Sequence, residues 1–495
     1  MAEVLVIGAG VAGLGSALAL SQRGHRVTVV ERDTTSVPES PDAAFQEWER
    51  RGAPQVRHSH AFLARLRNLL RDRAPDVLHR LLDAGASEVR FVDQPPVTLE
   101  DRERRPGDED LVALACRRTT FEWVLRRHTL AAGNVCLVEG SVNRLISDGT
   151  ARGGVPNIVG VGWEGGGELH ADLVIDASGV RSPLTKWLAA IGAAPVAEKE
   201  KDTGIVYSSR FYRLLEGQEL PVQEGPVLGD LDYLKYAVFV GDNRTFSITF
   251  GLHAGDGELR QLLRPGPFTV AAESLPGLRP WIPPTRCEPI TGVEVMARLV
   301  NRRRRFVNAG RPVATGIFAV GDSAICTNPL YGRGCSLAMV HAYLLADVLE
   351  DHPRDPVEAA LAFAAVTRDE IEPWYTAAVA QDRQSRTGPD IPLSSDDPSS
   401  DDALDDDDAD PPVDAQTMRS IMRDGLLPAA RTDPIVYRAF LRAFNLLDQP
   451  NAIMADADVV GRVLAAWQLR DQRPPPPVLG PDREEMLRIL ARAAA

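Results

Sequence analysis

The sequence predicts an α/β protein whose main domain is assembled from segments that lie far apart along the chain. Val4–Ile7 and Arg26–Glu31 are short apolar runs, separated by a glycine-rich loop and a helical stretch. This βαβ pattern is typical of a strand–helix–strand unit with strands buried on both faces. Another apolar strand ends at Gly321-Asp322, more than 300 residues later. Between Gly204 and Met296, alternating and aromatic-rich stretches indicate a separate antiparallel sheet, which gives the chain an α+β character.

The glycine loop Gly8–Gly13 predicts a dinucleotide site. Its three glycines are placed for a tight turn, for close approach of the backbone to a diphosphate, and for close helix–strand packing. The diphosphate would lie at a helix N-terminus, where free N–H groups favour anions. Glu31 follows Gly13 by 18 residues, at the end of the second strand, where a carboxylate can accept both ribose hydroxyls.

Three basic segments are further candidates for contact with a ligand. Arg118 lies at the start of a helix expected over Arg117–Leu130, where its charge can reach a cofactor phosphate or ring, and a solvated arginine is the alternative. Arg57-His58-Ser59-His60 is a candidate lining of the cofactor or substrate side, with structural histidines as the alternative. Arg302–Arg305 has the composition of an anion-binding patch, but an exposed hairpin is the favoured interpretation.

The segment after Gly321 indicates which dinucleotide is bound. Asp322 ends its strand where a carboxylate can accept hydrogen bonds from the ribityl chain of FAD. Gly332 and Gly334 let the backbone pass close to a ring system, and a helix begins near Gly334. Its positive end would stabilise the negative charge of a reduced flavin. FAD therefore fits better than NAD, because only FAD needs both this segment and the Gly8–Gly13 loop.

Composition and charge are those of a globular protein without a nucleic-acid partner. The chain has 495 residues, enough for two or more domains, with 44% hydrophobic and 25% charged residues. The net charge is −14, but ten aspartates between Asp396 and Asp414 contribute most of it and the remainder carries only −4. We therefore expect no nucleic-acid partner. The 388–414 stretch is also poor in apolar residues and predicts a disordered, dispensable loop, with an acidic docking arm as the alternative.

Cysteine usage and hydropathy predict a cytoplasmic protein. The five cysteines show no CxxC spacing and their odd number excludes full pairing, as is typical of reduced thiols. No run of 18 apolar residues predicts a membrane span. The apolar N-terminus contains Glu3 and four glycines, which do not fit a signal peptide.

These motifs together resemble the FAD-dependent monooxygenases of the para-hydroxybenzoate hydroxylase type. The resemblance rests on the Gly8–Gly13 loop, Glu31, Arg118, Asp176-Ala177-Ser178-Gly179 and Gly321-Asp322, and covers roughly residues 1–385. The segments Asn328–Gly334 and Arg57–His60 resemble a narrower group, the bacterial polyether flavin epoxidases and squalene epoxidase. The resemblance implies FAD, with contacts expected from twelve residues and no metal: Gly8, Ala9, Gly10, Gly13, Glu31, Arg32, Arg118, Gly321, Asp322, Pro329, Gly332 and Gly334.

The resemblance also implies a domain plan. A discontinuous Rossmann-like FAD-binding domain would comprise residues 1–75, 112–200 and 297–385, with a substrate domain in 76–111 and 201–296. An acidic loop at 386–414 and C-terminal helices at 415–495 complete the plan.

The implied reaction is transfer of one oxygen atom from a flavin hydroperoxide to a small apolar olefinic or aromatic substrate, with dioxygen as co-substrate. Epoxidation and hydroxylation both remain open, the setting would be secondary metabolism, and no catalytic residue can be assigned. A reductase or dehydrogenase of isoprenoid-type substrates is the alternative. A flavin halogenase is disfavoured, because no lysine precedes Lys186.

The sequence departs from the family pattern at two positions, and the first of them concerns the reductant. Ser178 stands where the family carries an aspartate that is linked to both FAD and nicotinamide contact, and Ile325 stands where a histidine is common. NAD(P)H is therefore expected as the electron source either directly or through a separate flavin reductase.

Overall fold

The computed structural model describes residues 1–33, 35–151, 154–164, 167–222, 227–386, 415–473 and 478–494. The chain forms two compact units. The first comprises Met1–Val89, Val112–Val379 and Leu479–Ala495, and the second comprises Arg90–Leu111 and Ala380–Val478. These units divide the expected 76–111 segment between them and assign the end of the expected C-terminal region to the first unit. Apart from Arg386, the expected acidic loop at 386–414 lies outside the described residues.

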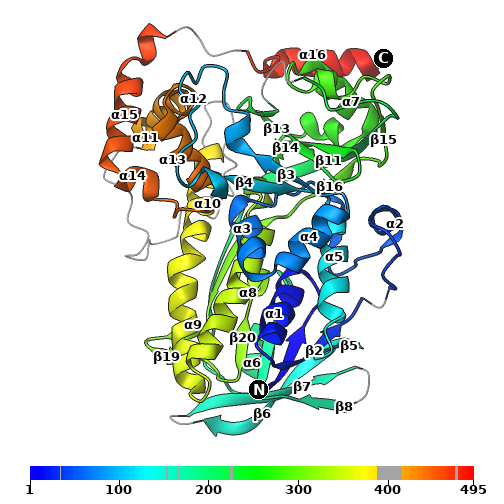
Figure 1. The fold of residues 1–495 in the computed structure, drawn as a ribbon, viewed down its shortest axis with the longest axis vertical. Helices are drawn as coiled ribbons and strands as arrows, with labels where there is room; N and C mark the ends of the chain where they lie inside the picture. Colours follow the sequence, from blue (N-terminus) through cyan, green and yellow to red (C-terminus); the bar gives the residue numbers. More distant parts are fainter. Residues whose placement is uncertain are drawn as a thin grey trace. The chain divides into compact units, whose positions relative to one another are not determined.

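A five-stranded parallel sheet is the centre of the first unit (Figure 1). Its strands run in the order β20-β9-β1-β2-β5, and every neighbouring pair is parallel. The α/β class predicted from the sequence is thereby confirmed, with the distant strand before Asp322 completing the sheet of the N-terminal βαβ unit. The strands are β1 (Glu3–Ile7), β2 (Arg26–Glu31), β5 (Val135–Glu139), β9 (Leu173–Asp176) and β20 (Ile317–Ala319).

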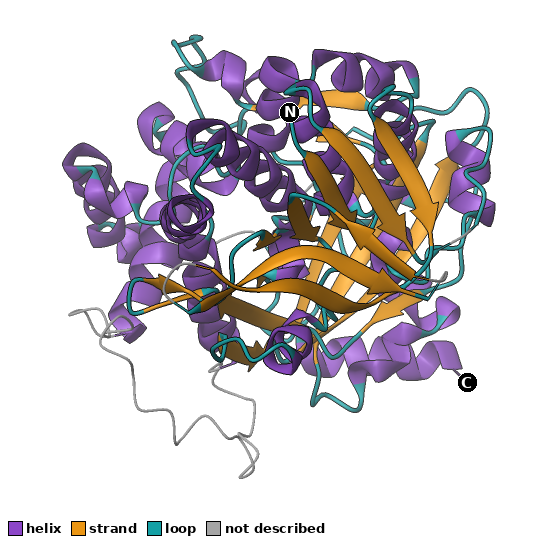
Figure 2. Cartoon of the chain, turned by 90° about the horizontal axis from the view of Figure 1, so that it is seen from below, coloured by secondary structure: helices purple, strands orange, loops and turns teal. Residues whose placement is uncertain are grey.

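Helices pack around this sheet (Figure 2). Helix α1 (Val11–Gln22) crosses α8 (Gly334–Asp351) at Gly15, where a side chain would come within 2.7 Å of the Met339 sulfur. The absence of a side chain at Gly15 therefore lets the helices of the two cofactor motifs approach closely. The apolar core beside this sheet also includes residues of α3 (Ala64–Arg73), α4 (Pro75–Asp83), α5 (Arg118–Leu130) and α9 (Pro356–Glu370). The chain further forms α6 (Leu184–Ala190) and α10 (Glu372–Arg386), and the residues of α10 are divided between the two units.

A second, antiparallel sheet belongs to the same unit. Along β11 and β14, alternate residues face opposite sides, so that Tyr212, Phe246 and Phe250 enter an apolar core. That core is closed by α7 (Pro265–Ser274) and by α16 (Arg483–Ala494), whose Met486 and Leu490 are fully buried. The strands are β11 (Ile205–Leu214), β12 (Leu228–Asp230), β13 (Leu234–Val240), β14 (Thr245–His253), β15 (Cys287–Pro289) and β16 (Glu294–Met296).

Arg302–Arg305 does not form the exposed hairpin that the sequence favoured. These arginines lie in β17 (Val300–Arg305), between β10 (Ala197–Asp202) and β21 (Ile325–Cys326). Glu198 and Glu200 on β10 and Glu372 on α10 pair with them, and Arg303 and Arg304 are buried. The facing carboxylates neutralise the arginines, and this basic segment can therefore form the central strand of a three-stranded sheet.

The remaining elements of the first unit are smaller. One three-stranded sheet consists of β6 (Val142–Ala151), β7 (Val155–Trp163) and β8 (Gly167–His170). The others are the short helix α2 (Pro41–Glu47) and the pairs β3 (Ser87–Arg90) with β4 (Val112–Ala115) and β18 (Val307–Asn308) with β19 (Arg311–Pro312).

The second unit is helical. The Tyr437 hydroxyl donates to the Phe91 carbonyl at 2.9 Å, and Arg438 pairs with the buried carboxylate of Asp108 at 2.8 Å. These contacts place residues 90–111 with the C-terminal helices α11 (Ala415–Ser420), α12 (Leu427–Thr432), α13 (Pro434–Phe444), α14 (Ala452–Ala455) and α15 (Ala457–Gln468). Within the described ranges, no helix combines the length and apolar character needed to cross a membrane.

Candidate cofactor-binding site

In the glycine loop between β1 and α1, a side chain would clash with neighbouring atoms at two of the three glycines, and the third glycine faces open space. A Cβ at Gly13 would lie 1.9 Å from the Gly8 carbonyl oxygen, and one at Gly8, where φ is +98°, would lie 2.8 Å from the Ala177 carbonyl oxygen. A Cβ at Gly10 would meet nothing within 4 Å. Gly10 is the N-cap of α1 and no side chain caps this helix. The first-turn N–H groups therefore have no intrahelical acceptor and border open space.

Glu31 fastens this loop from the end of β2. Its buried carboxylate accepts the Ala9 N–H at 2.7 Å and the Asp33 N–H at 2.9 Å, one bond to each oxygen. Each carboxylate oxygen retains capacity for a second hydrogen bond, as ribose recognition would require. Arg32 is exposed and borders an open surface groove beside Glu31. Asp33, Arg51, Gly140, Ser141 and Glu164 line the rest of the groove.

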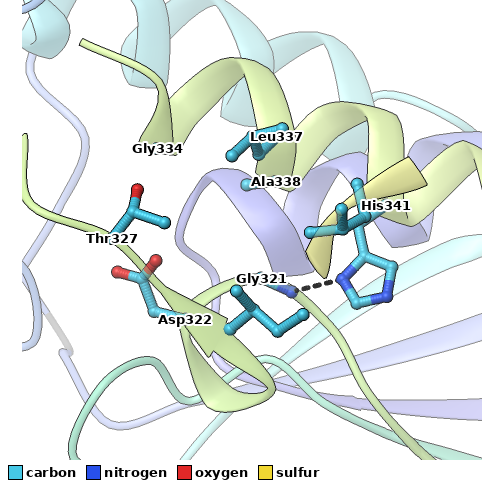
Figure 3. A pocket seen from close by; sticks show the side chains of 9 residues that line it. Gly321, Asp322, Thr327, Gly334, Leu337, Ala338 and His341 are labelled. Atoms are coloured by element: carbon cyan, nitrogen blue, oxygen red, sulfur yellow. Dashed lines mark hydrogen bonds between the residues drawn. The ribbon is translucent and has the colours of Figure 1, made fainter. Parts of the chain in front are cut away.

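The second half of the site lies where β20 ends. Asp322, Thr327 and Gly334 line a small cavity with Leu337, Ala338 and His341 of α8 (Figure 3). Asp322 and Thr327 both border this cavity, and the Thr327 hydroxyl oxygen is buried without a hydrogen-bond partner among the described residues. Burial raises the pKa of the Asp322 carboxyl, while the charge of Arg118 acts to lower it. The cavity therefore holds polar groups that a ligand would satisfy.

His341 was not identified from the sequence, yet it orients the Gly321-Asp322 turn. Its Nδ1 accepts the Gly321 N–H at 3.2 Å, so its Nε2–H donates to the Thr367 hydroxyl at 3.0 Å. Burial lowers the pKa of His341 to about 3, which keeps the ring neutral. The available signal was a histidine inside the mainly apolar run that begins at Leu337.

The solvated alternative for Arg118 is wrong, because only 11% of its side chain is exposed. Its Nε donates to Glu122 at 2.7 Å and its Nη1 lies 2.9 Å from His60 Nε2. Burial acts to lower the pKa of Arg118, but Cys335, Glu122 and Asp322 together raise it above its ordinary value. Arg118 is therefore a fixed cation close to Asp322.

The Arg57–His60 segment positions Arg118. His60 Nδ1 lies 2.8 Å from the His58 carbonyl, which can only accept, so Nδ1 carries the proton and Nε2 accepts from Arg118. Burial lowers the pKa of His60 well below its ordinary value, and the charge of Arg118 adds to this effect. His60 is thus a neutral acceptor that fixes the guanidinium.

A chain of buried charges joins the two halves of the site. Arg50, which the sequence did not single out, donates to the Ala9 carbonyl at 3.0 Å and lies 3.7 Å from Glu31 and 3.4 Å from Glu122. Glu122 in turn pairs with Arg118. Two nitrogens of Arg50 are buried without hydrogen-bond partners among the described residues. Arg50 lies in an irregular segment after α2, where no periodicity marks it.

Ser178, the departure from the family pattern, faces inward. Its hydroxyl donates to Asp176 Oδ1 at 2.5 Å, and its N–H donates to the same oxygen at 3.1 Å. Burial raises the pKa of Asp176, and these hydrogen bonds act against that increase. The serine hydroxyl therefore caps the end of β9.

The start of α8 borders open space, as the start of α1 does at Gly10. Pro329 is exposed, and Gly332 has φ of +64° with Ala61 so close that a Cβ would lie 2.8 Å from its methyl group. Gly334 has nothing within 4 Å of its Cβ position. Two uncapped helix starts, two glycines that face open space and the unpaired Thr327 hydroxyl fit an elongated cofactor with an anionic diphosphate and a ring.

The buried histidines predict a loss of stability in mild acid. Burial lowers the pKa of His58 to about 4 and that of His341 to about 3. Below pH 6.5 the unfolded chain therefore binds protons that the folded protein excludes, so stability falls as pH falls. Between pH 7 and 5.5 we expect the two residues to lower the free energy of unfolding by about 2–3 kcal/mol. Urea unfolding at several pH values measures this, and His341→Gln should make the decline shallower.

Sequence comparison agrees with the site's geometry. The model of the family "FAD dependent oxidoreductase" matches residues 3–348. Protein Rv3254 of Mycobacterium tuberculosis is 27% identical over 95% of both chains. Squalene monooxygenase of Mus musculus is 25% identical over 71% of this chain and 55% of its own length. The resemblance to flavoprotein monooxygenases stated from the motifs is thereby confirmed.

Solved structures with a similar fold include flavin-dependent enzymes. Flavin-dependent brominase Bmp2 superposes with a TM-score of 0.58 at 14% identity, over 95% of this chain and 98% of its own. Anhydrotetracycline hydroxylase OxyS of Streptomyces rimosus gives 0.55 at 18% identity, over 90% and 76%. PqsL of Pseudomonas aeruginosa, a probable FAD-dependent monooxygenase, gives 0.53 at 16% identity, over 77% and 95%. These likenesses show the fold, and the family match shows membership: the chain belongs to the FAD-dependent oxidoreductases.

Proposed function

We propose that this oxidoreductase is an FAD-dependent monooxygenase that transfers one oxygen atom of dioxygen to an apolar olefinic or aromatic substrate. The observation that carries the proposal is the meeting of two distant motifs at one site, bridged by buried charge from Glu31 through Arg50 and Glu122 to Arg118. The names of three relatives, squalene monooxygenase, OxyS hydroxylase and PqsL, support oxygen transfer as the reaction class.

Each residue of the site has a proposed part in holding FAD. The first-turn N–H groups of α1, beside Gly10, would receive the diphosphate, and Glu31 the adjoining ribose. Arg32 and the groove beside it would receive the adenosine end. Asp322 and Thr327 would hydrogen-bond the ribityl chain. Pro329, Gly332 and Gly334 would lie along the ring.

FAD, once reduced, supplies the activation of dioxygen, and the protein supplies placement and charge. Arg118 stays protonated and fixed by His60 and Glu122, so its positive charge is available without rearrangement. The start of α8 directs further partial positive charge toward the ring position. No general base is required for transfer of oxygen to an olefin, which agrees with the lack of an assigned catalytic residue.

We infer a small, apolar pathway intermediate, because the Asn328–Gly334 segment resembles that of flavin epoxidases and the antiparallel sheet is rich in Phe and Tyr. NAD(P)H would supply electrons directly or through a separate flavin reductase. The inward-facing Ser178 supports the second route, because its hydroxyl is engaged by Asp176. A cytoplasmic location fits the five unpaired cysteines.

Labelled dioxygen tests the reaction class. The holoprotein, a reductant and a panel of olefins and arenes should yield a product that contains one labelled oxygen. If the label is found only in peroxide and water across the panel, the protein is instead a reductase or dehydrogenase, for which isoprenoid-type substrates are the alternative. Rapid oxidation of NADPH by the purified protein alone would show that no separate reductase is needed.

Asp322→Ala should weaken FAD binding without unfolding the protein. The change removes a carboxylate that would accept hydrogen bonds from the ribityl chain, worth about 1.5–3 kcal/mol, or roughly 10- to 150-fold in dissociation constant. Titration of the apoprotein with FAD measures the effect. Asp369→Ala, an exposed carboxylate on α9, is the control. Equal affinities for the two variants would refute the assignment of Asp322.

A further inference from the structure

The antiparallel sheet turns a polar face toward the flavin end of the site. Because residues alternate along a strand, the face opposite the apolar core carries Tyr207, Ser209, Ser247 and Thr249. Three of these four side chains are almost fully buried, and Thr249 is partly buried. A buried hydroxyl without a partner costs free energy, so a face of this composition needs specific acceptors and donors opposite it.

The first partner is the loop that precedes α8. The Tyr207 hydroxyl donates to Asn328 Oδ1 at 2.7 Å, and the same oxygen accepts the Leu330 N–H at 3.0 Å. The Asn328 N–H donates to Asn301 Oδ1 at 2.7 Å. Asn328 is completely buried. One side chain of the sheet therefore fixes the residue from which Pro329, Gly332 and Gly334 follow.

The second partner is the segment that positions Arg118. The Thr249 hydroxyl donates to Ser59 at 2.6 Å, and the Ser59 hydroxyl donates to Ser247 at 2.7 Å. Since Thr249 has only one proton, the 2.9 Å bond from Ser209 must be donated by Ser209. Ser209 in turn accepts from His58 Nδ1 at 3.4 Å. Every bond in this chain thus has a defined direction, which fixes the 58–60 segment against the sheet.

We propose that the polar face of β11 and β14 is a positioning surface that holds both loops at the flavin end, with Tyr207 and Thr249 as its positioning residues. This inference rests on the proposed FAD site. One sheet sets the backbone beside the expected ring through Asn328 and sets the Arg118 guanidinium through Ser59 and His60. Displacement of this sheet is therefore transmitted to both sides of the cofactor, because hydrogen bonds with fixed direction tolerate little misalignment.

Tyr207→Phe and Tyr212→Phe form a matched pair for the test. Both tyrosines are buried on β11, but Tyr212 faces the apolar core and Tyr207 faces the other side of the sheet. The two substitutions therefore remove one hydroxyl each, from opposite faces. In the apoprotein, Tyr207→Phe should accelerate hydrogen exchange at the Leu330 amide by roughly three- to tenfold. FAD should bind roughly three- to tenfold more weakly, and the visible circular dichroism of bound FAD should change. Tyr212→Phe should alter none of these three properties.

Thr249→Val tests the second loop. It keeps the shape of the side chain and removes the donor to Ser59, so FAD affinity should fall by a similar factor while the melting temperature changes little. Thr269→Val on α7, behind the opposite face, is its control. Identical Leu330 exchange and identical flavin dichroism in the two tyrosine variants would overturn the proposal. Failure of the wild-type protein to bind FAD would overturn the cofactor site instead, and Leu330 exchange would still decide whether the sheet holds the loop.

Discussion

Gly13→Ala is expected to abolish FAD retention and to destabilise the fold. The new Cβ would lie 1.9 Å from the Gly8 carbonyl oxygen and 3.4 Å from the Ala177 methyl group. The closest atom belongs to the backbone, so α1 must move away from β1, at a cost of roughly 3 kcal/mol or more. The uncapped first turn of α1 moves with it. Flavin content of the purified protein and its melting temperature measure the two effects.

Two other glycines provide the controls. Gly133→Ala adds a methyl group where nothing lies within 4 Å, so neither property should change. Gly10→Ala also meets open space, and the apoprotein should therefore keep its melting temperature. The Gly10 position is nevertheless expected to lie against the diphosphate, so FAD affinity should fall. Full flavin content in the Gly13 variant, or unchanged FAD affinity in the Gly10 variant, would show that the loop does not hold the cofactor.

Asp242→Ala should lower the free energy of unfolding by about 3–5 kcal/mol, because it leaves the buried Arg117 charge without its main partner. The Asp242 carboxylate accepts hydrogen bonds from the backbone N–H of Arg117 at 2.7 Å, from the guanidinium of Arg117 at 2.6 Å and from the Thr120 hydroxyl at 2.8 Å. Both charged side chains are almost completely buried. This ion pair ties the turn between β13 and β14 to the start of α5, the helix that presents Arg118.

Asp230→Ala is the matched control for Asp242→Ala. Asp230 lies in the same sheet and pairs with Lys235, but its side chain is 53% exposed. Exposed pairs contribute about 0–1 kcal/mol, so this variant should unfold at almost the wild-type urea concentration. A similar loss in the two variants would mean that burial does not determine the strength of the Asp242 pair.

Local patterns were sufficient to predict the parallel sheet and the two halves of the site. The Gly8–Gly13 loop and the strand before Asp322 are marked by apolar runs and glycines within a few residues of each other. Arg118 was placed at a helix start because the helical pattern begins there, and α5 begins at that residue. Physical requirements on short segments decide these features, so the sequence alone displays them.

The remaining features depend on pairs that are distant in sequence. His341 contacts Gly321 across 20 residues, and Tyr207 contacts Asn328 across 121. Arg50 reaches Ala9 across 41 residues from a segment without periodicity. Each is a single polar residue whose partner is defined only by the folded chain. No spacing rule connects such residues.

The compact units divide two segments differently from the expected domain plan, for the same reason. Residues 90–111 were expected in the substrate domain, but Asp108 pairs with Arg438 across 330 residues. The last helix was expected with the other C-terminal helices, but Met486 and Leu490 complete the core of the antiparallel sheet. Arg302–Arg305 looked exposed because its carboxylate partners lie more than 60 residues away on either side.

Hydrogen exchange with and without FAD tests most directly whether the two distant motifs form one cofactor site. The apoprotein and the FAD-saturated protein would be compared by mass spectrometry at peptide resolution. FAD binding should slow exchange in two separate regions, the glycine loop at residues 8–13 and the segment at residues 321–334. Protection confined to the glycine loop would contradict a single site built from both motifs, because the cofactor would then be held by one of them only.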